Sequence, residues 1–526
     1  MRTTAGIPFT QAVTRHGQRV AVSDSTRPLT FRELKGRANR IGSGLSAMGI
    51  VPGDRVGVLS FNRNEVVELW LGLERFGHVR VVLHSHFDMG LHVDTVNQLG
   101  IGTIVFDVRF VDALDAVRQR MLPVQRFIAI GDGCPSWAIP YEKVLRDGKP
   151  DDPSLDVDEN DICLLQCTSG TTGAPKPWVM THRASRALVA HNIEQMDTMS
   201  SHMPAIGPGD VNLHFHALQW ASGALTLMAF MLRGAKTVLM DDEKFDPQAL
   251  VDTLAREKTT ATFIPGPMLP PILDALEATP GTRAPLRRVT IYFATPELLE
   301  RTGRVLGPVW CHGYGSTEQG GPTARLTAED VAGNPRRLES VGRPATVLNE
   351  LLVMDEHGTH LAANAVGEIV ARSAMSSNKY WNLPEETTKA FFDRDWFRPR
   401  DIGYFDDDGF LYYLDRAKDR IETPGGVVYP HVVEAVLLGH AAVANCGVVS
   451  VPAGETQQIV AAVKLRDGSK GDGALEKDLL SRAHSLPEHQ RPTLIRFVEH
   501  LPTVLGGAKV QRDVLQKSLI AGGVGA

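Results

Sequence analysis

The first half of the chain alternates short apolar runs with longer segments in which apolar residues recur every three or four positions. Residues 29–49 show the longer pattern, with apolar side chains at Leu34, Ala38, Ile41, Leu45 and Met48. This spacing predicts a helix with one buried face. Thr30 and Glu33 have the spacing of a capping box at its start, and Gly49 is placed to end it.

Apolar runs at 54–60, 79–83, 103–106 and 126–130 predict buried strands, and the segment 66–76 predicts a helix between the first two. We expect a second series of strands at 162–166, 237–240, 261–264 and 289–293. Strands that alternate with helices are typical of an α/β domain with a mainly parallel sheet. The apolar stretch 221–232 has polar flanks and predicts a buried helix rather than a membrane span.

The pattern changes after about residue 345. Short alternating segments at 350–354 and 367–371, with turn residues at 355–358 and 406–409, predict a β-rich subdomain. A further unit at 419–526 has helical patterns at 430–438 and 474–485 and strand patterns at 446–451 and 459–465. The predicted fold is α/β: a large N-terminal domain, residues 1–415, of two α/β subdomains plus the β-rich subdomain, and a small mobile α+β domain, residues 416–526.

The totals exclude several classes of protein. A chain of 526 residues with a net charge of −6 lacks the basic balance of a nucleic-acid binder. Its five cysteines are scattered, which predicts free thiols and a cytoplasmic location rather than a disulfide framework or a zinc site. The N-terminus has no apolar core long enough for a signal peptide, and we expect no membrane span.

A loop rich in hydroxyls and glycines follows the apolar run at 162–165. Glycines let backbone N–H groups turn towards an anion, hydroxyls add donors, and a lysine adds positive charge. The sequence therefore predicts a phosphate-binding loop, although a turn without a ligand would have a similar composition. The predicted loop residues are Thr168, Ser169, Gly170, Thr171, Thr172, Gly173 and Lys176.

The string from Thr168 to Lys176 resembles the signature loop of the adenylate-forming superfamily, which contains acyl-CoA ligases, firefly-type luciferases and nonribosomal adenylation domains. The segment Gly313, Tyr314, Gly315, Ser316, Thr317, Glu318 resembles the aromatic-Gly-x-Thr-Glu motif of the same superfamily. The resemblance implies that Tyr314 packs on adenine, that Thr317 contacts the α-phosphate, and that Glu318 helps to hold Mg²⁺. It extends over about residues 25–515.

Further segments match in order. Ala294, Thr295 and Pro296 resemble the turn beside the adenine, and Asp401 matches the carboxylate that accepts both ribose hydroxyls. The segment 413–419 resembles the hinge between the two domains. There, Tyr413 and Arg416 belong to the nucleotide site, and Lys418 is the residue about which the small domain rotates. Residues 425–430 resemble the glycine loop of the pantetheine tunnel. Lys509 resembles the catalytic lysine that bridges the substrate carboxylate and the α-phosphate.

The resemblance places His216 at the entrance of the acid pocket, where we expect it to take part in catalysis; a core histidine is the alternative. The other predicted pocket residues are Gln219, Trp220, Phe293 and Gln319. Bulky side chains with a few polar groups in the pocket favour a compact aromatic acid. A short or medium acyl chain fits less well, and a long fatty chain fits least. The sequence departs from the superfamily pattern at Pro177, Pro399, Arg400 and Ala508, which leaves the local shape of those segments open.

We therefore expect an AMP-forming ligase that uses ATP and Mg²⁺ to activate a carboxylic acid and transfers it to CoA. Three alternatives remain open at the level of sequence. The acceptor is a separate carrier protein; or the enzyme adenylates a small anion such as nitrite and transfers it to an aromatic amine; or the chain binds nucleotide without catalysis. The sequence does not decide between a monomer and a homodimer.

Overall fold

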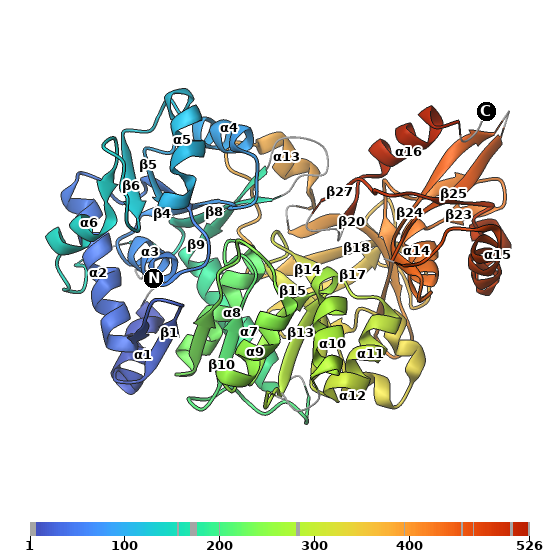
Figure 1. The fold of residues 1–526 in the computed structure, drawn as a ribbon, viewed down its shortest axis with the longest axis horizontal. Coiled ribbons are helices and arrows are strands. Elements are labelled where there is room, and N and C mark those ends of the chain that lie inside the picture. Colours follow the sequence, from blue (N-terminus) through green and yellow to red (C-terminus); the bar gives the residue numbers. More distant parts are fainter. Residues whose placement is uncertain are drawn as a thin grey trace.

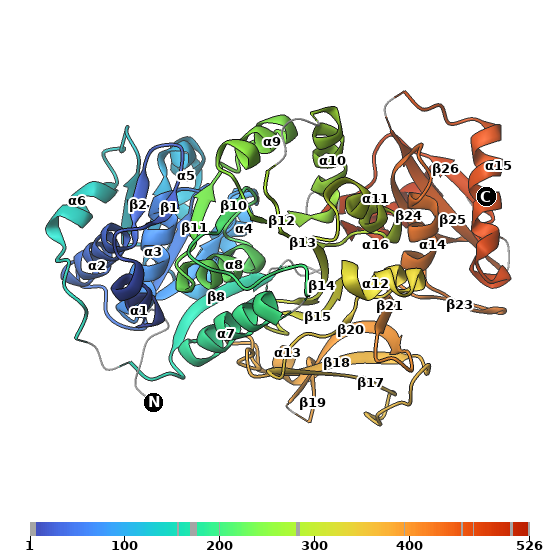
Figure 2. The same cartoon turned by 90° about the horizontal axis from the view of Figure 1, so that it is seen from below.

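The computed structural model describes residues 7–154, 157–168, 176–198, 200–279, 284–393, 395–453, 456–466, 468–504 and 509–523. In these ranges the strands form two large sheets, a smaller antiparallel sheet, a C-terminal sheet and two hairpins. Helices α1 (Ile7–His16) and α15 (Gly473–Arg482) lie at opposite ends of the molecule in both views (Figure 1, Figure 2). This mixed architecture, with a large N-terminal part and a smaller C-terminal part, confirms the predicted α/β fold.

The first sheet has the strand order β7-β6-β5-β3-β4-β8-β9 and is parallel except for β9 at its edge. Its strands are β3 (Arg55–Leu59), β4 (Val79–Leu83), β5 (Thr103–Asp107), β6 (Arg126–Ile130), β7 (Ile139–Pro140), β8 (Ile162–Thr168) and β9 (Lys176–Thr181). The strand expected at 162–166 is β8, but its assignment to the second series was wrong. It pairs in parallel with β4 through a long crossover connection, which the local residue pattern does not reveal.

The second sheet has the order β16-β15-β14-β13-β12-β10-β11-β1-β2. Its strands are β1 (Val20–Ser23), β2 (Pro28–Thr30), β10 (Val211–His214), β11 (Lys236–Leu239), β12 (Ala261–Pro265), β13 (Arg288–Tyr292), β14 (Trp310–Ser316), β15 (Gly321–Thr327) and β16 (Arg343–Pro344). Strands β10, β12, β13 and β14 are neighbours and parallel. Their carboxyl ends therefore meet at one edge of the sheet, which is where ligands bind in open α/β sheets.

Helices cover both faces of both sheets. They are α2 (Phe31–Ala47), α3 (Asn64–Arg75), α4 (Met89–Leu99), α5 (Val111–Val117), α6 (Tyr141–Asp147), α7 (His182–Thr198), α8 (Ala221–Leu232), α9 (Pro247–Arg256), α10 (Leu269–Ala278) and α11 (Pro296–Leu306). Helix α2 begins with the predicted capping box of Thr30 and Glu33. Helices α9, α10 and α11 pack on one face of the second sheet, and α7 and α8 pack on the other. None of the helices in the described ranges is long and apolar enough to cross a bilayer.

Helix α3 is buried along its whole length. Val67 and Leu71 pack with α2, α8 and the second sheet, whereas Leu69 and Leu73 pack against the first sheet. The helix therefore lies between the two sheets and has no face left for solvent, so its charged side chains must find partners inside the protein.

The remaining elements form a β-rich layer and a C-terminal unit, at the bottom and right of Figure 2. The layer contains β17 (Asn349–Met354), β18 (Gly367–Ser373), β19 (Phe391–Phe392), β20 (Trp396–Phe405) and β21 (Leu411–Arg416), with α12 (Ala328–Ala332) and α13 (Pro384–Lys389) beside it. The C-terminal unit contains β22 (Ile421–Thr423), β23 (Gly426–Val428), α14 (Pro430–Leu438), β24 (Val443–Ala453), β25 (Thr456–Leu465), β26 (Leu494–Phe497), β27 (Thr503–Val504), β28 (Lys509–Val510) and α16 (Arg512–Ala521).

The burial of α3 makes the ion pair between Arg37 and Glu68 a testable element of stability. The Glu68 side chain is fully buried; Arg37 Nε lies 2.5 Å from Glu68 Oε1, and the Tyr141 hydroxyl donates to Glu68 Oε2 at 2.9 Å. Arg37→Met leaves the carboxylate without its main partner, which destabilises proteins by about 3–5 kcal/mol. We expect the temperature of thermal unfolding to fall by roughly 5 °C or more.

The matched control for this substitution is Arg304→Met, which removes an exposed pair with Glu300 at 3.5 Å. Exposed pairs contribute about 0–1 kcal/mol, so the unfolding temperature should change by no more than roughly 2 °C. Equal shifts in the two variants would show that Glu68 does not depend on Arg37.

A second stability prediction concerns Asp415, where the β-rich layer meets the C-terminal unit. Burial raises the pKa of Asp415 to about 7, although Arg512 opposes the shift. Its carboxyl accepts the backbone N–H of His431 at 2.7 Å. The folded protein thus keeps this proton up to about pH 7, whereas the unfolded chain loses it near pH 3.8. Stability from this group is therefore highest below about pH 4 and declines as pH rises towards 7, by on the order of 1 kcal/mol per pH unit.

The measurement compares the unfolding temperatures of the wild-type protein and Asp415→Asn between pH 4.5 and 8. The asparagine variant has no titrating group, so it should gain stability relative to wild type as pH rises to about 7 and then keep a constant difference. A difference that is independent of pH over this range would show that the carboxyl is already ionised at pH 4.5.

Candidate functional site

The predicted site residues gather where the strands of the second sheet end. His216 follows β10, Ala294 follows β13, and the segment from Gly313 to Ser316 lies in β14. From the first sheet, Thr168 ends β8 and pairs with Lys176 at the start of β9. The rest of the predicted phosphate loop, which comprises Ser169, Gly170, Thr171, Thr172 and Gly173, lies outside the described residues.

The centre of the site is a cluster of Tyr314, Asp401, Tyr413 and Arg416. The Tyr314 hydroxyl donates a hydrogen bond to Asp401 Oδ2 at 2.6 Å, and Arg416 Nε lies 4.0 Å from Asp401 Oδ1. The Tyr314 and Tyr413 rings lie 6.1 Å apart. Burial and the carboxylate of Asp401 raise the pKa of Tyr314 well above its usual value. Residues from β14, β20 and β21 thus form one polar site.

A second group surrounds Glu318 in the turn between β14 and β15. The Tyr380 hydroxyl donates to Glu318 Oε1 at 3.1 Å, and burial with the charge of Glu318 raises the pKa of Tyr380. Lys176 pairs with Glu386 of α13 and lies 5.9 Å from the Tyr380 ring centre. Tyr380 and Glu386 have no motif of their own in the sequence, and only the fold brings them to the site.

The residues after β13 also make hydrogen bonds that fix the local backbone. The Ala294 N–H donates to His312 Nε2 at 3.5 Å. The Thr295 side chain accepts the Leu298 N–H and caps α11, and Pro296 occupies the first turn of that helix. Ser316 Oγ accepts the Gln319 N–H at 3.3 Å. The turn is therefore held rigidly beside β14.

Aromatic rings continue from this edge into the interior. The His216 ring lies 4.1 Å from that of His214 and 4.5 Å from that of Phe263, and the Phe263 ring lies 4.9 Å from that of Tyr292. Burial lowers the pKa of His216 well below its usual value, and the neighbouring His214 lowers it further. Neither ring nitrogen of His216 has a hydrogen-bond partner. Both histidines are neutral and buried beside the predicted acid pocket.

The other predicted pocket residues differ in their burial and in their contacts. Gln219 joins two elements of the first sheet, accepting the Ser85 N–H at 3.1 Å and donating to the Ser60 carbonyl at 2.6 Å. Trp220 packs against His84 at 4.2 Å. Gln319 is 1% exposed with both side-chain polar atoms unpartnered. Phe293, by contrast, is 64% exposed, so its ring does not line a buried pocket.

The C-terminal candidates are only partly described. Lys509 pairs through its backbone with Val504 in the hairpin of β27 and β28. The Lys418 ammonium lies 4.0 Å from Asp419 Oδ1. Ala508 lies outside the described residues. Pro177 accepts the Trp381 N–H at 2.8 Å through its carbonyl. Arg400, which follows Pro399, has a positive φ of 65°.

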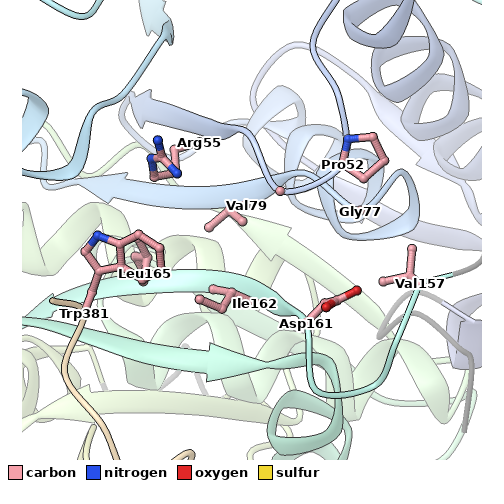
Figure 3. A pocket seen from close by; sticks show the side chains of 10 residues that line it. Pro52, Arg55, Gly77, Val79, Val157, Asp161, Ile162, Leu165 and Trp381 are labelled. Carbon is pink, nitrogen blue, oxygen red and sulfur yellow. The ribbon is translucent and has the colours of Figure 1, made fainter.

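A cavity of about 300 Å³ lies elsewhere, at the amino-terminal ends of β3, β4 and β8 (Figure 3). Its walls include Arg55, Val79, Ile162 and Trp381. Ligands of parallel sheets bind at the opposite, carboxyl ends of the strands, so this cavity does not belong to the site of Tyr314 and Asp401. In the described ranges no group of three or more His, Cys, Asp or Glu side chains is placed to hold a metal ion.

Comparison with known proteins agrees with this geometry. Residues 9–381 match the family model of the AMP-binding enzymes, and residues 432–505 match the C-terminal domain of these enzymes. The chain is 29% identical to the medium/long-chain-fatty-acid–CoA ligase FadD8 of Mycobacterium tuberculosis, over 86% of this chain and 78% of the relative. It is 28% identical to the 3-hydroxybenzoate–CoA/4-hydroxybenzoate–CoA ligase of Thauera aromatica, over 98% and 97%.

Solved structures show the same fold. The anthranilate CoA ligase AuaEII, in complex with anthranoyl-AMP, superposes with a TM-score of 0.89 at 21% identity, over 99% of this chain and 98% of that one. The amide bond synthetase McbA of Marinactinospora thermotolerans gives 0.83 at 24% identity, over 98% and 100%. With a family model that spans most of its length, the chain belongs to the family of AMP-binding enzymes.

Proposed function

We propose that this chain is an AMP-forming CoA ligase that activates a compact aromatic carboxylic acid. An AMP-forming acid–thiol ligase is the class of enzyme that its family membership indicates. The observation that carries the proposal is the cluster of the His216, Phe263 and Tyr292 rings at the strand ends of the second sheet. The neighbouring strand β14 carries Tyr314, which bonds to Asp401 of the β-rich layer.

The nucleotide part of the proposal rests on the polar cluster. Asp401 would accept the two ribose hydroxyls, since one carboxylate can accept two adjacent donors. Arg416 would add positive charge beside it. The ring of Tyr314 is held by its hydroxyl's bond to Asp401 and would present its face to adenine. Thr317, Lys176 and the loop residues 168–173 would contact the phosphates, and Ala294, Thr295 and Pro296 would border the adenine.

Glu318 suits a role in Mg²⁺ binding. Its carboxylate is a hard oxygen donor, and one oxygen is oriented by Tyr380. Mg²⁺ in nucleotide sites is commonly held by one or two carboxylates together with phosphates and water, which fits a site in which Glu318 is the protein's contribution. The cation would neutralise the charge of ATP. Thr317 would contact the α-phosphate, and Glu318 would act on the triphosphate through the cation.

The chemistry requires no nucleophilic side chain. A substrate carboxylate oxygen attacks the α-phosphorus of ATP, the bond from that phosphorus to the bridging oxygen of the β-phosphate breaks, and pyrophosphate leaves. The CoA sulfur then attacks the acyl carbon, the bond to the AMP oxygen breaks, and the thiol proton passes to solvent. The first barrier is largely repulsion between two anions, which Lys509 and Lys176 would reduce by electrostatic stabilisation.

The size of the acid is proposed from the ring cluster. Phe263 and Tyr292 place two large rings within 4.9 Å of one another at the ends of adjacent strands, which favours a flat, short substrate over a long chain. The hydroxybenzoate–CoA ligase of Thauera aromatica, named above, aligns over 98% of this chain. Relatives named for fatty acids align as well, so similarity alone does not choose between the two.

The proposed second half-reaction needs a movement of the small domain. We propose residues 1–415 as the large domain and 416–526 as the lid that carries Lys509. Rotation about Lys418 would withdraw Lys509 and admit CoA along the loop at 425–430. His216 would move with the opening of the thiol path.

The first experiment measures pyrophosphate release from ATP and Mg²⁺ with a panel of aromatic, short and medium-chain acids, with and without CoA. We expect aromatic acids to give the highest kcat/KM and to yield a thioester. Lys509→Ala should lower the rate of adenylation by on the order of 100-fold or more, because removing one preorganised charge-stabilising group has that effect. Lys517→Ala, an exposed lysine of α16, is the matched control and should retain activity.

The outcomes separate the proposals. Thioester formation from a supplied acyl-adenylate should survive Lys509→Ala if the lysine serves only the first step. Turnover with medium or long acids alone would refute the aromatic substrate. Pyrophosphate release without a thioester would refute CoA as acceptor, and silence with every carboxylate but turnover with nitrite and an aromatic amine would replace the substrate class altogether.

A further inference from the structure

Rows of side chains cross the face of the second sheet that α7 and α8 cover. The row nearest the strand ends contains Tyr292 of β13, Gly313 of β14 and Arg325 of β15. Gly313 pairs with Arg325. Because Ile291 pairs with His312, the next residues, Tyr292 and Gly313, lie at the same level. Residues in register on adjacent strands point to the same face. The Tyr292 ring leans over Gly313, where a Cβ atom would lie 2.9 Å from it. Arg325 thus shares a row with the proposed acid pocket.

Arg325 is a buried cation without a carboxylate. The residue is 6% exposed, and its guanidinium donates to Gln195 Oε1 of α7 and to Cys311 Sγ at 3.1 Å. No carboxylate in the described part of the chain lies within 4.0 Å of its nitrogens. Buried guanidinium groups are normally paired with an anion, so the positive charge of Arg325 lacks its usual partner.

A second arginine in the same state lies behind it. Arg288 lies deeper on the same face, pairs with Ala261 and is 3% exposed. Its Nη2 donates to the Pro204 carbonyl at 2.8 Å, whereas Nη1 has no partner. Burial, with a contribution from the charge of Arg325, lowers the pKa of Arg288 to about 10. In the described residues Arg288 also has no carboxylate within 4.0 Å.

The nearest carboxylates are already engaged elsewhere. Asp210 pairs with Arg287 at 2.5 Å, and Asp197 pairs with Arg233. Both carboxylates act on the charge of Arg288 from a distance, but neither forms an ion pair with it. A buried charge without a paired partner is unfavourable, and two like charges on one face also repel each other. The same face carries the His216 ring, whose nitrogens are also unpartnered. This face therefore carries two buried positive charges, and Arg288 Nη1 is a donor without a partner.

We propose that the acid substrate carries a second anionic group, which Arg325 binds with Arg288 behind it. This inference rests on the proposed function and narrows it: the substrate class becomes compact aromatic acids with two acidic groups, one adenylated at the strand ends and the other held against Arg325. Phe263 and Tyr292 would border the ring between them. A guanidinium suits this task because its planar fork binds a carboxylate through two hydrogen bonds.

The test compares dicarboxylic acids with uncharged counterparts of equal shape. Phthalate, isophthalate and terephthalate are each paired with the corresponding methylbenzoate, and kcat/KM is measured by pyrophosphate release. We expect the best dicarboxylic acid to exceed its methyl counterpart by on the order of 100-fold or more, since a site that binds a polar group discriminates strongly against its absence. Arg325→Met should abolish most of this ratio by lowering activity on the dicarboxylic acid alone.

Two variants keep the test sharp. Arg343→Met is the matched control, because Arg343 is the partner of Arg325 on β16 but is exposed and paired with Asp330 at 2.7 Å; it should leave the ratio unchanged. Arg325→Lys keeps the charge and should retain part of the preference if Arg325→Met fails to fold. A wild-type enzyme that accepts methylbenzoates as well as dicarboxylic acids overturns the inference, as does an equal loss on both acids in Arg325→Met.

Binding is measured separately, so that failure of catalysis does not obscure the result. Thermal unfolding is followed with each dicarboxylic acid and each methylbenzoate in the absence of ATP. A stabilisation specific to the dicarboxylic acid, and lost in Arg325→Met, supports the anion site even if no acid is activated, in which case only the proposed function fails. The absence of any such stabilisation, together with no preference in turnover, overturns the site itself.

Discussion

The parallel pairing of β10, β12, β13 and β14 is the constraint on which the site depends. Parallel strands place their carboxyl ends at one edge, where backbone connections leave the sheet and side chains are free to meet a ligand. His216, Ala294 and the turn at 316–320 all follow from this single arrangement. The β-rich layer then adds Asp401 across from Tyr314, and α13 adds Glu386 beside Lys176.

Two residues close in sequence to predicted site residues have backbones that favour glycine. Phe293 has a φ of 59° and Arg400 a φ of 65°, and a side chain in this left-handed region costs about 1 kcal/mol or more. Gly266 packs so closely on Phe293 that a Cβ atom would lie 2.0 Å from the Phe293 carbonyl oxygen, so the surrounding structure fixes the turn. Arg400 is anchored by its bond to the Lys389 carbonyl at 2.8 Å. The departure from the superfamily pattern at Arg400 is thus accommodated by a local contact.

The sequence predicted the elements that depend on local order. The capping box at Thr30, the helix α14 and the strands β4 and β6 agree with their predicted ranges. It failed where distant segments pair: the strand at 162–166 was assigned to the second series, whereas β8 pairs with β4 of the first sheet. The motif around Tyr314 is recognisable from its own spacing, and the structure brings Tyr314 to Asp401. Tyr380 is not recognisable in this way, because its contact with Glu318 spans 62 positions and no local pattern encodes it.

Buried charges in this molecule are compensated in different ways. In the helix between the sheets, Glu68 meets Arg37, and Arg75 meets Asp152 at 2.5 Å, so the fold compensates its own charges. Arg288 and Arg325 are buried as deeply but meet only a carbonyl, an amide and a thiol. Among the described residues, a buried arginine without an ion pair also occurs away from the site, since Arg80 of β4 is 4% exposed and lies over the Trp70 ring at 4.4 Å. Arg288 and Arg325 differ from it in their position, because they lie on the sheet face of the proposed acid pocket, where an anionic group of the ligand would compensate them. This contrast is the physical basis for assigning an anionic group to the substrate.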